Sequence, residues 1–314
     1  MFTTVNKHSI IGRWLMRYRN FLGFSSAAIV LFISVTGFDL PKLPGGGVPD
    51  AIKALPTPDM PVPPLLVTGV GKTVYLFEVG RQTPENDNKV NDKVKEIFQR
   101  LKTAALADEK YHAVAKELEE EWKLNTLRVK NPSIPAAAFP GGGIALYTGS
   151  FKDIKYEEVL ASILGHEMAH LLSQHHLQRW NRAAATALME IGPKITSGEP
   201  LDKMDPKVIG PVLGAMGIGY VVGEDLPLER EKELVADCSG LVLAAKAGYD
   251  PAATEEFLHK QTDTPQLFKL HPPFGDRYSH ISKTCLSDAQ TAFHKATGGK
   301  QKHDSALLPD VKMS

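Results

Sequence analysis

The chain has 314 residues, 43% hydrophobic and 23% charged, so it is long enough to bury a core in one large domain or two small ones. Lysine plus arginine number 36, as do aspartate plus glutamate, and this balance excludes the basic excess of a typical nucleic-acid-binding protein. Only two cysteines occur, Cys238 and Cys285. Neither lies in a Cys-x-x-Cys pair, so we predict neither a disulfide scaffold nor a thiolate metal site. A metal ion would need histidine and carboxylate ligands.

The N-terminus has the composition of a targeting region. Residues 1–38 contain no acidic side chain, and their lysine and arginines precede an uncharged run at 21–38. A helix of that length covers roughly 27 Å, the thickness of a thin bilayer core. We therefore predict a basic targeting region at 1–20 and a membrane anchor at 21–38, with a cleaved signal or transit sequence as the alternative. The positive-inside rule then places the rest of the chain across the membrane.

Residues 39–86 are predicted to form a tether, because their many prolines and glycines cannot sustain a helix or a central strand. Within this tether, Thr73–Val79 has the composition of a short strand that would dock the tether onto the following domain.

The following domain is predicted to span 87–298, ahead of a polar tail at 299–314. From Asp87 to Trp122, apolar residues recur at helical spacing with one break, which predicts two helices. Leu124–Val129 alternates as a strand does, and Gly143–Gly149 has the composition of another strand. A small sheet is therefore expected before the next helix.

That next helix is predicted to begin near Asp153 or Lys155 and to continue to Trp180. The apolar, glycine-rich segment 208–223 is either a buried helix or a hydrophobic surface that dips into a bilayer, because it is too short for a full span. Glu229–Ala247 is predicted to be a second long helix, ended by Gly248 with a proline soon after.

The motif His166-Glu167-Met168-Ala169-His170 lies in the first of these long helices. Residues four apart share a helical face, so the two histidines can bind one metal ion. Glu167 is rotated about 100° from His166, where it can act as a general base rather than as a ligand. His175 and His176 fit no ligand position and are predicted to lie on the helix exterior.

A catalytic zinc ion has three protein ligands and an open position, so one further ligand is needed. On the second long helix, Glu233 and Asp237 are four apart on one face, with Arg230 one turn earlier. We predict Glu233 as the third ligand and Asp237 as the acceptor of a hydrogen bond from a ligand histidine. The alternative is a solvated face with charges at salt-bridge spacing. Apolar neighbours such as Leu234 disfavour it.

Four ordered blocks carry a resemblance to a known family: His166–His170, Leu226–Asp237, Ala247–Pro251 and His271–Arg277. Together they resemble the CaaX-prenyl-protease-related gluzincin metallopeptidases from about residue 88 to 290. Within that family, the chain is most similar to mitochondrial inner-membrane endopeptidases and their bacterial periplasmic relatives.

The resemblance implies an α+β, mostly helical fold: a zincin-like metallopeptidase domain with a small sheet before the motif helix. It implies one zinc ion per chain on His166, His170 and Glu233, with Glu167 as the general base. It places Asp237 and Arg230 behind the ligands, and it implies that His271 and Arg277 stabilise the oxyanion of the tetrahedral intermediate.

The resemblance also implies a strand before the motif helix that pairs with substrate through backbone hydrogen bonds. The residues predicted to bind substrate there are Ala136, Ala137, Ala138, Phe139, Gly141 and Gly142. The chain departs from the family in this segment, because the usual asparagine is replaced by Pro135 or Ala136. Glu229 likewise stands where the family has serine.

The sequence therefore predicts a zinc-dependent endopeptidase that cleaves membrane-associated or misfolded proteins. Its expected partners are polypeptide substrates and, through the N-terminal segment, a membrane; no nucleic acid is expected, and a homo-oligomer is left open. We expect it in the mitochondrial inner membrane, facing the intermembrane space, or alternatively in the bacterial inner membrane, facing the periplasm. The functional alternatives are a chaperone or assembly factor with little turnover, and a latent protease whose His271 loop occupies the open zinc position.

Overall fold

The computed structural model describes residues 64–130, 132, 134–154, 156–175, 227–261 and 273–298. The chain divides into two compact units, one formed by 1–77 and 176–220 and the other by 78–175 and 221–314. The anchor predicted at 21–38, the segment 208–223, the tail at 299–314 and His271 are not among the described residues. Within the described ranges, no helix is both long and apolar enough to cross a membrane.

Helix α4, Pro64–Arg81, corrects the prediction of a tether that reaches residue 86. The segment Thr73–Val79 was predicted as a strand, but it lies inside this 18-residue helix. Proline is tolerated at the helix start because the first N–H groups of a helix need no intrahelical partner. Val74 and Tyr75 are buried. Burial of such residues outweighs their strand propensity, which is only a weak local preference.

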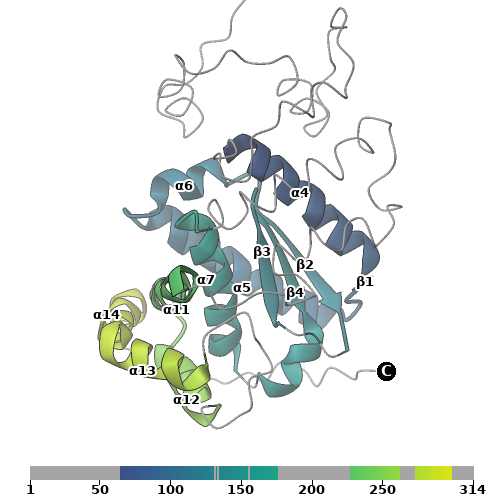
Figure 1. Cartoon of the computed structure of the whole chain (residues 1–314). Helices are drawn as coiled ribbons and strands as arrows, with labels where there is room; N and C mark the ends of the chain where they lie inside the picture. Colours follow the sequence, from purple (N-terminus) through teal and green to yellow (C-terminus); the bar gives the residue numbers. More distant parts are fainter. Residues whose placement is uncertain are drawn as a thin grey trace, which may run out of the picture. The chain divides into compact units, whose positions relative to one another are not determined.

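The sheet has four strands in the order β1-β2-β4-β3 (Figure 1). The strands are β1 Thr83–Pro84, β2 Lys123–Arg128, β3 Ala136–Phe139 and β4 Gly143–Tyr147. β2 pairs with β4 in parallel, whereas β1 pairs with β2 and β3 with β4 in antiparallel fashion. The predicted small sheet is confirmed. Among the described residues, β3 lies at the edge of the sheet and pairs with β4.

The helices before the motif follow the prediction. Asp87 caps α5, Asn88–Ala107, by accepting hydrogen bonds from two backbone N–H groups, and α6, His112–Glu117, follows. After β4, the chain forms a short 3-10 helix, Thr148–Asp153, before the motif helix α7.

The motif helix α7, Glu157–Leu172, is shorter than predicted. Its end was predicted near Trp180, but the described chain turns after Leu172, and Gln174 has a φ of 56°, in the left-handed region. This conformation cannot continue a right-handed helix.

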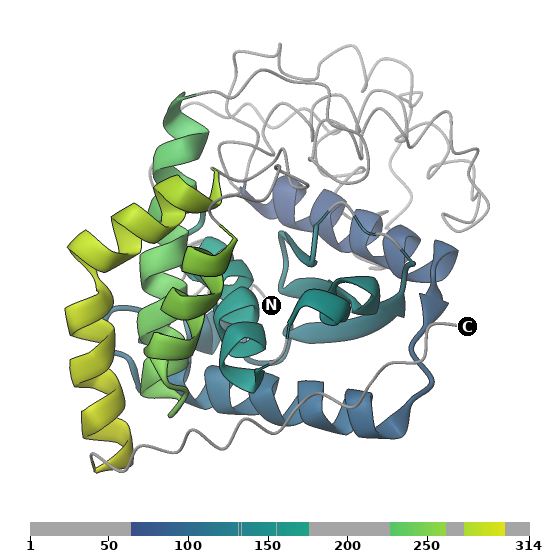
Figure 2. The same cartoon turned by 90° about the horizontal axis from the view of Figure 1, so that it is seen from below.

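Beyond the motif, α11 (Pro227–Lys246) closes at Gly248, which has a φ of 87°, as predicted. The remaining described helices are α12 Pro251–Lys260, α13 Phe274–Thr284 and α14 Leu286–Thr297. Helix α11 lies beside α7 in both views of the chain (Figures 1 and 2).

The core consists of two apolar clusters. The larger one joins α5, α7 and the sheet, and the smaller one joins α11 to α12, α13 and α14. A disulfide between Cys238 and Cys285, whose Cα atoms are 5.6 Å apart, crosses the smaller cluster. The cysteine spacing did not predict it, because 47 residues of chain separate two thiols that only helix packing brings together.

The backbones of α7 and α11 meet at two glycines. A Cβ atom at Gly240 would lie 2.4 Å from the backbone nitrogen of His166, and one at Gly165 would lie 2.6 Å from the carbonyl oxygen of Gly240. Real Cβ atoms do not approach backbone so closely, so each position requires glycine. This close crossing brings the motif helix against the carboxylates of α11.

Candidate metal centre and active site

Three potential ligand atoms converge where α7 and α11 cross. His166 Nε2 lies 3.1 Å from His170 Nε2. The carboxylate of Glu233 places one oxygen 3.3 Å from His166 Nε2 and the other 3.4 Å from His170 Nε2. His166 and Glu233 are buried, so an ion held here would be largely removed from bulk solvent. The three ligands predicted from the sequence are thus brought together.

The spacing of these atoms fits a tetrahedral zinc ion. Zinc bonds to imidazole nitrogen and carboxylate oxygen measure about 2.0–2.2 Å, so two ligands at a tetrahedral angle lie roughly 3.3–3.5 Å apart. The observed separations of 3.1 to 3.4 Å come close to this value. Two nitrogens and one carboxylate also form a ligand set that zinc accepts with a fourth position open.

Asp237 binds the ring nitrogen of His166 that points away from the other two candidate ligands. His166 Nδ1 lies 2.9 Å from Asp237 Oδ1, and it donates the hydrogen bond because a carboxylate can only accept. Nδ1 therefore carries the proton, and Nε2 is directed toward the metal position. Burial opposes ionisation of Asp237, but Arg277 and His166 hold its pKa well below the usual range. The role predicted for Asp237 agrees with this geometry.

The carboxylates around His166 favour the protonated form of its imidazole. Burial alone would lower the pKa of this imidazole, but the carboxylates of Asp237 and Glu233 raise the pKa to about 10. A metal ion coordinates only a deprotonated ring nitrogen, so metal binding must displace a proton from His166.

Arg277 forms a two-pronged contact with Asp237. Its Nε donates to Asp237 Oδ2 at 2.9 Å and its Nη2 donates to Asp237 Oδ1 at 2.5 Å. Such paired hydrogen bonds fix the orientation of a carboxylate. The oxyanion role predicted for Arg277 stays a prediction, as does the role of His271, which the structure does not describe.

Arg230 is not brought to the ligands. Its guanidinium is exposed and pairs with the carboxylate of Asp276 at the start of α13. The one-turn spacing from Glu233 placed it on the correct helix, but its long side chain extends to the surface.

His175 is the site residue that sequence reasoning missed. Its Nδ1 lies 3.3 Å from Nδ1 of His170. Burial together with the charges of His170 and Lys232 lowers the pKa of His175 to about 4, so the ring is neutral and its Nδ1 can accept a hydrogen bond from His170. The prediction that it lies on the helix exterior is wrong, because an uninterrupted helix would turn it away, whereas the turn at Gln174 returns it to the site.

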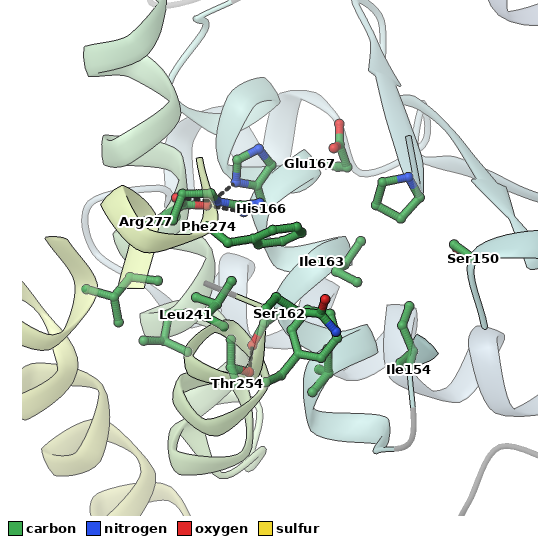
Figure 3. Close-up of a pocket in the computed structure, with 17 residues that line it drawn as sticks. Ser150, Ile154, Ser162, Ile163, His166, Glu167, Leu241, Thr254, Phe274 and Arg277 are labelled. Carbon is green, nitrogen blue, oxygen red and sulfur yellow. Dashed lines mark hydrogen bonds and ion pairs between the residues drawn. The ribbon is translucent and has the colours of Figure 1, made fainter. Parts of the chain in front are cut away.

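Glu167 lies next to His166 and lines a pocket together with His166 and Arg277. In the view of Figure 3, His166 lies between Glu167 and Arg277 at one end of this pocket. Glu167 is 6% exposed. The general base predicted from the motif is therefore shielded from bulk solvent and borders the space where a substrate would bind.

The segment predicted to bind substrate forms β3 and the turn that follows it. Ala136 and Phe139 are buried, so their side chains belong to the core, and β3 is an edge strand of the described sheet. Pro135, just before β3, lines the same pocket as Glu167. Gly141 and Gly142 make the turn into β4, with φ values of 95° and 92°.

Comparison with known proteins agrees with this geometry. The family model described as Peptidase family M48 matches residues 88–285. The mitochondrial metalloendopeptidase OMA1 of Arabidopsis thaliana is 28% identical over 145 residues, which cover 46% of this chain and 27% of that protein. The putative beta-barrel assembly-enhancing protease of Vibrio cholerae is 30% identical over 145 residues, 46% of this chain and 30% of that protein.

A bovine relative, the mitochondrial metalloendopeptidase OMA1 of Bos taurus, is 26% identical over 164 residues, 49% of this chain and 31% of its own length. The match thus spans about a third or less of each of these relatives. The family model, in contrast, covers more than half of this chain and includes every described residue of the proposed metal site. The chain therefore belongs to peptidase family M48.

Proposed function

We propose that this chain is a zinc-dependent endopeptidase that hydrolyses peptide bonds in membrane-associated or misfolded proteins. The observation that carries the proposal is the convergence of His166, His170 and Glu233, with Glu167 beside them at the pocket. Membership of a peptidase family supports it, and so do relatives named as metalloendopeptidase and protease.

Each residue of the site has a definite task in this reaction. His166, His170 and Glu233 would hold a zinc ion, which would act as a Lewis acid on the scissile carbonyl and lower the pKa of a bound water toward about 7. Glu167 accepts the proton of the attacking water and returns it to the leaving amine. Asp237 keeps the Nδ1 proton on His166, and Arg277 keeps Asp237 in place.

The outer edge of β3, the edge strand of the described sheet, is where we propose that an extended substrate pairs. Backbone N–H and C=O groups at a sheet edge pair with an added strand regardless of its side chains. A folded protein rarely presents a free extended segment, whereas a misfolded one does. This preference supports the proposed role in protein quality control.

The Cys238–Cys285 disulfide supports an oxidising compartment. We propose the mitochondrial inner membrane, with the catalytic unit facing the intermembrane space, and the bacterial inner membrane facing the periplasm as the alternative. Relatives with mitochondrial names support the first location.

Cleavage of casein by the purified full-length chain tests the proposal. Activity should disappear with a chelator and return with zinc, and Glu167→Gln should keep its zinc but lose about 10²- to 10⁴-fold in rate. Glu231→Gln, at an exposed position on α11, is the control and should cleave as the wild type does. Equal cleavage by the Glu167 variant would remove Glu167 as the base, and chelator-sensitive binding of casein without cleavage would favour the chaperone alternative.

A further inference from the structure

The pocket that begins at His166 and Glu167 continues into an apolar chamber. Its volume is about 140 Å³, and helices α7, α11, α12 and α13 all contribute to its wall. The apolar side chains that form this wall include Ile163, Leu241, Phe257, Leu258, Phe274 and Ile281. Figure 3 shows Ile163, Leu241 and Phe274 around this space.

The size of the chamber limits what can fill it. A cavity of about 150 Å³ lined by leucine, isoleucine and phenylalanine is known to bind benzene. The whole pocket, including its end at His166 and Glu167, is close to that volume, and the apolar part of its wall is of the same kind. It can therefore hold the side chain of leucine, methionine or phenylalanine.

The hydroxyl groups of Ser162 and Thr254, which line the chamber, have hydrogen-bond partners within the protein. Ser162 Oγ and Thr254 Oγ1 lie 2.7 Å apart, and Thr254 Oγ1 also donates to the backbone oxygen of Glu158 at 3.4 Å. Because the Thr254 hydroxyl donates its hydrogen bond to this backbone oxygen, the Ser162 hydroxyl donates its own to Thr254 Oγ1. A charged side chain would lose its water in this apolar part of the pocket, so it should bind there more weakly than an apolar one.

The position of the chamber decides which substrate residue enters it. His166 and Glu167 line the same pocket as the apolar wall, so a side chain in the chamber belongs to a residue directly beside the bond that is cut. At this end of the pocket, Arg277 and Asp237 form an ion pair, so their charges largely offset each other.

We infer that this chamber selects substrates with leucine, methionine or phenylalanine next to the scissile bond. The inference rests on the proposed peptidase function and names its substrate class. Large apolar side chains are buried in folded proteins and exposed in misfolded ones. The chamber would therefore select substrates by one side chain, whereas the edge of β3 would bind their backbone.

The first test measures kcat/KM on peptides that differ at one residue beside the scissile bond. Leucine should exceed alanine and aspartate by at least about 10-fold. Ile163→Ala and Phe274→Ala enlarge the chamber, so each should shift the preference from leucine toward phenylalanine and tryptophan. Leu118→Ala is the matched control, because Leu118 packs against the same core cluster as Ile163 but does not line the chamber. An unchanged preference in both chamber variants overturns the inference.

A binding measurement separates this inference from the proposed function. The zinc-loaded Glu167→Gln variant should bind a fluorescent leucine peptide at least about 10-fold more tightly than its aspartate counterpart. Equal binding of the two peptides overturns the inferred selectivity of the chamber, even if cleavage is zinc-dependent. Tighter binding of the leucine peptide supports the inferred selectivity of the chamber even if the wild-type chain cleaves no substrate. In that case only the peptidase proposal fails.

Discussion

Two buried glutamates in this chain have opposite surroundings. Glu85, between β1 and α5, accepts hydrogen bonds from Arg128, Thr148 and two backbone N–H groups, at 2.6 to 3.1 Å. Glu233, on α11, instead faces two imidazole nitrogens at 3.3 and 3.4 Å. Both are almost fully buried. Glu85 is surrounded by donors from its own chain, whereas the atoms around Glu233 suit the coordination of a cation.

The surroundings of Glu85 and Glu233 distinguish a structural carboxylate from a candidate metal ligand. Burial raises the pKa of Glu85, but Arg128 and the other donors outweigh it and lower the pKa to about 2. The fold thus stabilises the charge of Glu85 by itself. At Glu233, a zinc ion would supply the stabilisation, so the two residues should respond differently to substitution.

The largest expected effect is the loss of zinc affinity in Glu233→Ala. Removing a ligand should weaken zinc binding by on the order of 10³-fold, beyond the 10- to 100-fold typical of an outer partner. Competition with a chromophoric chelator measures this affinity, and Glu231→Ala, at an exposed position of α11, is the control. Zinc content that survives dialysis unchanged would place Glu233 outside the coordination sphere.

Glu85→Gln should show the opposite pattern, with lost stability and unchanged zinc affinity. A pKa lowered from 4.5 to about 2 corresponds to at most about 3 kcal/mol of unfolding free energy at pH 7, and solvent around Arg128 screens the pair and reduces this to about 1–2 kcal/mol. Because the folded-state pKa is depressed, this stabilisation is present above pH 4.5 and is lost as the pH falls toward 2. Denaturant unfolding from pH 7 to 2 should show wild type and variant converge. A difference in unfolding free energy that stays constant from pH 7 to 2 would contradict a stabilising role for the charge of Glu85.

Gly240→Ala tests whether the helix crossing builds the metal site. The added methyl group would meet the backbone of His166, so we expect a loss of about 1–3 kcal/mol in stability together with weaker zinc binding. Gly275→Ala is the matched control, because a Cβ there meets nothing within 4 Å. That variant should be as stable as the wild type or slightly more stable. Wild-type stability and zinc affinity in Gly240→Ala would show that the crossing tolerates a side chain.

The smallest effect is expected for His175→Ala. Loss of the neighbour of His170 Nδ1 should weaken zinc binding by about 10-fold, as for other outer partners of metal ligands. His175→Gln retains an acceptor and should recover part of the affinity. The same chelator competition measures both, and equal affinities in wild type and His175→Ala would leave His175 without a role at the metal.

Local spacing predicted much of the site. The four-residue intervals between His166 and His170 and between Glu233 and Asp237 fix helical faces without knowledge of the fold. Both helices were predicted, and the structure brings the predicted ligands together. Strands β2 and β4 of the small sheet before α7 were also predicted, because they alternate or are rich in β-forming residues, whereas β3 was expected from the resemblance and β1 was not predicted.

The features that the sequence did not reveal depend on tertiary packing. The Gly165–Gly240 contact and the Cys238–Cys285 disulfide join positions far apart in the chain. His175 reaches the site through a turn, which helical periodicity cannot anticipate. Helix α4 was mistaken for a strand because burial outweighs local propensity.

The most direct test of the account is a crystal structure of the zinc-loaded protein with diffraction recorded at the zinc absorption edge. We expect one anomalous peak per chain, within about 2.0–2.2 Å of His166 Nε2, His170 Nε2 and a Glu233 oxygen. A peak elsewhere, or no peak in protein that still cleaves casein, would contradict the proposed metal centre.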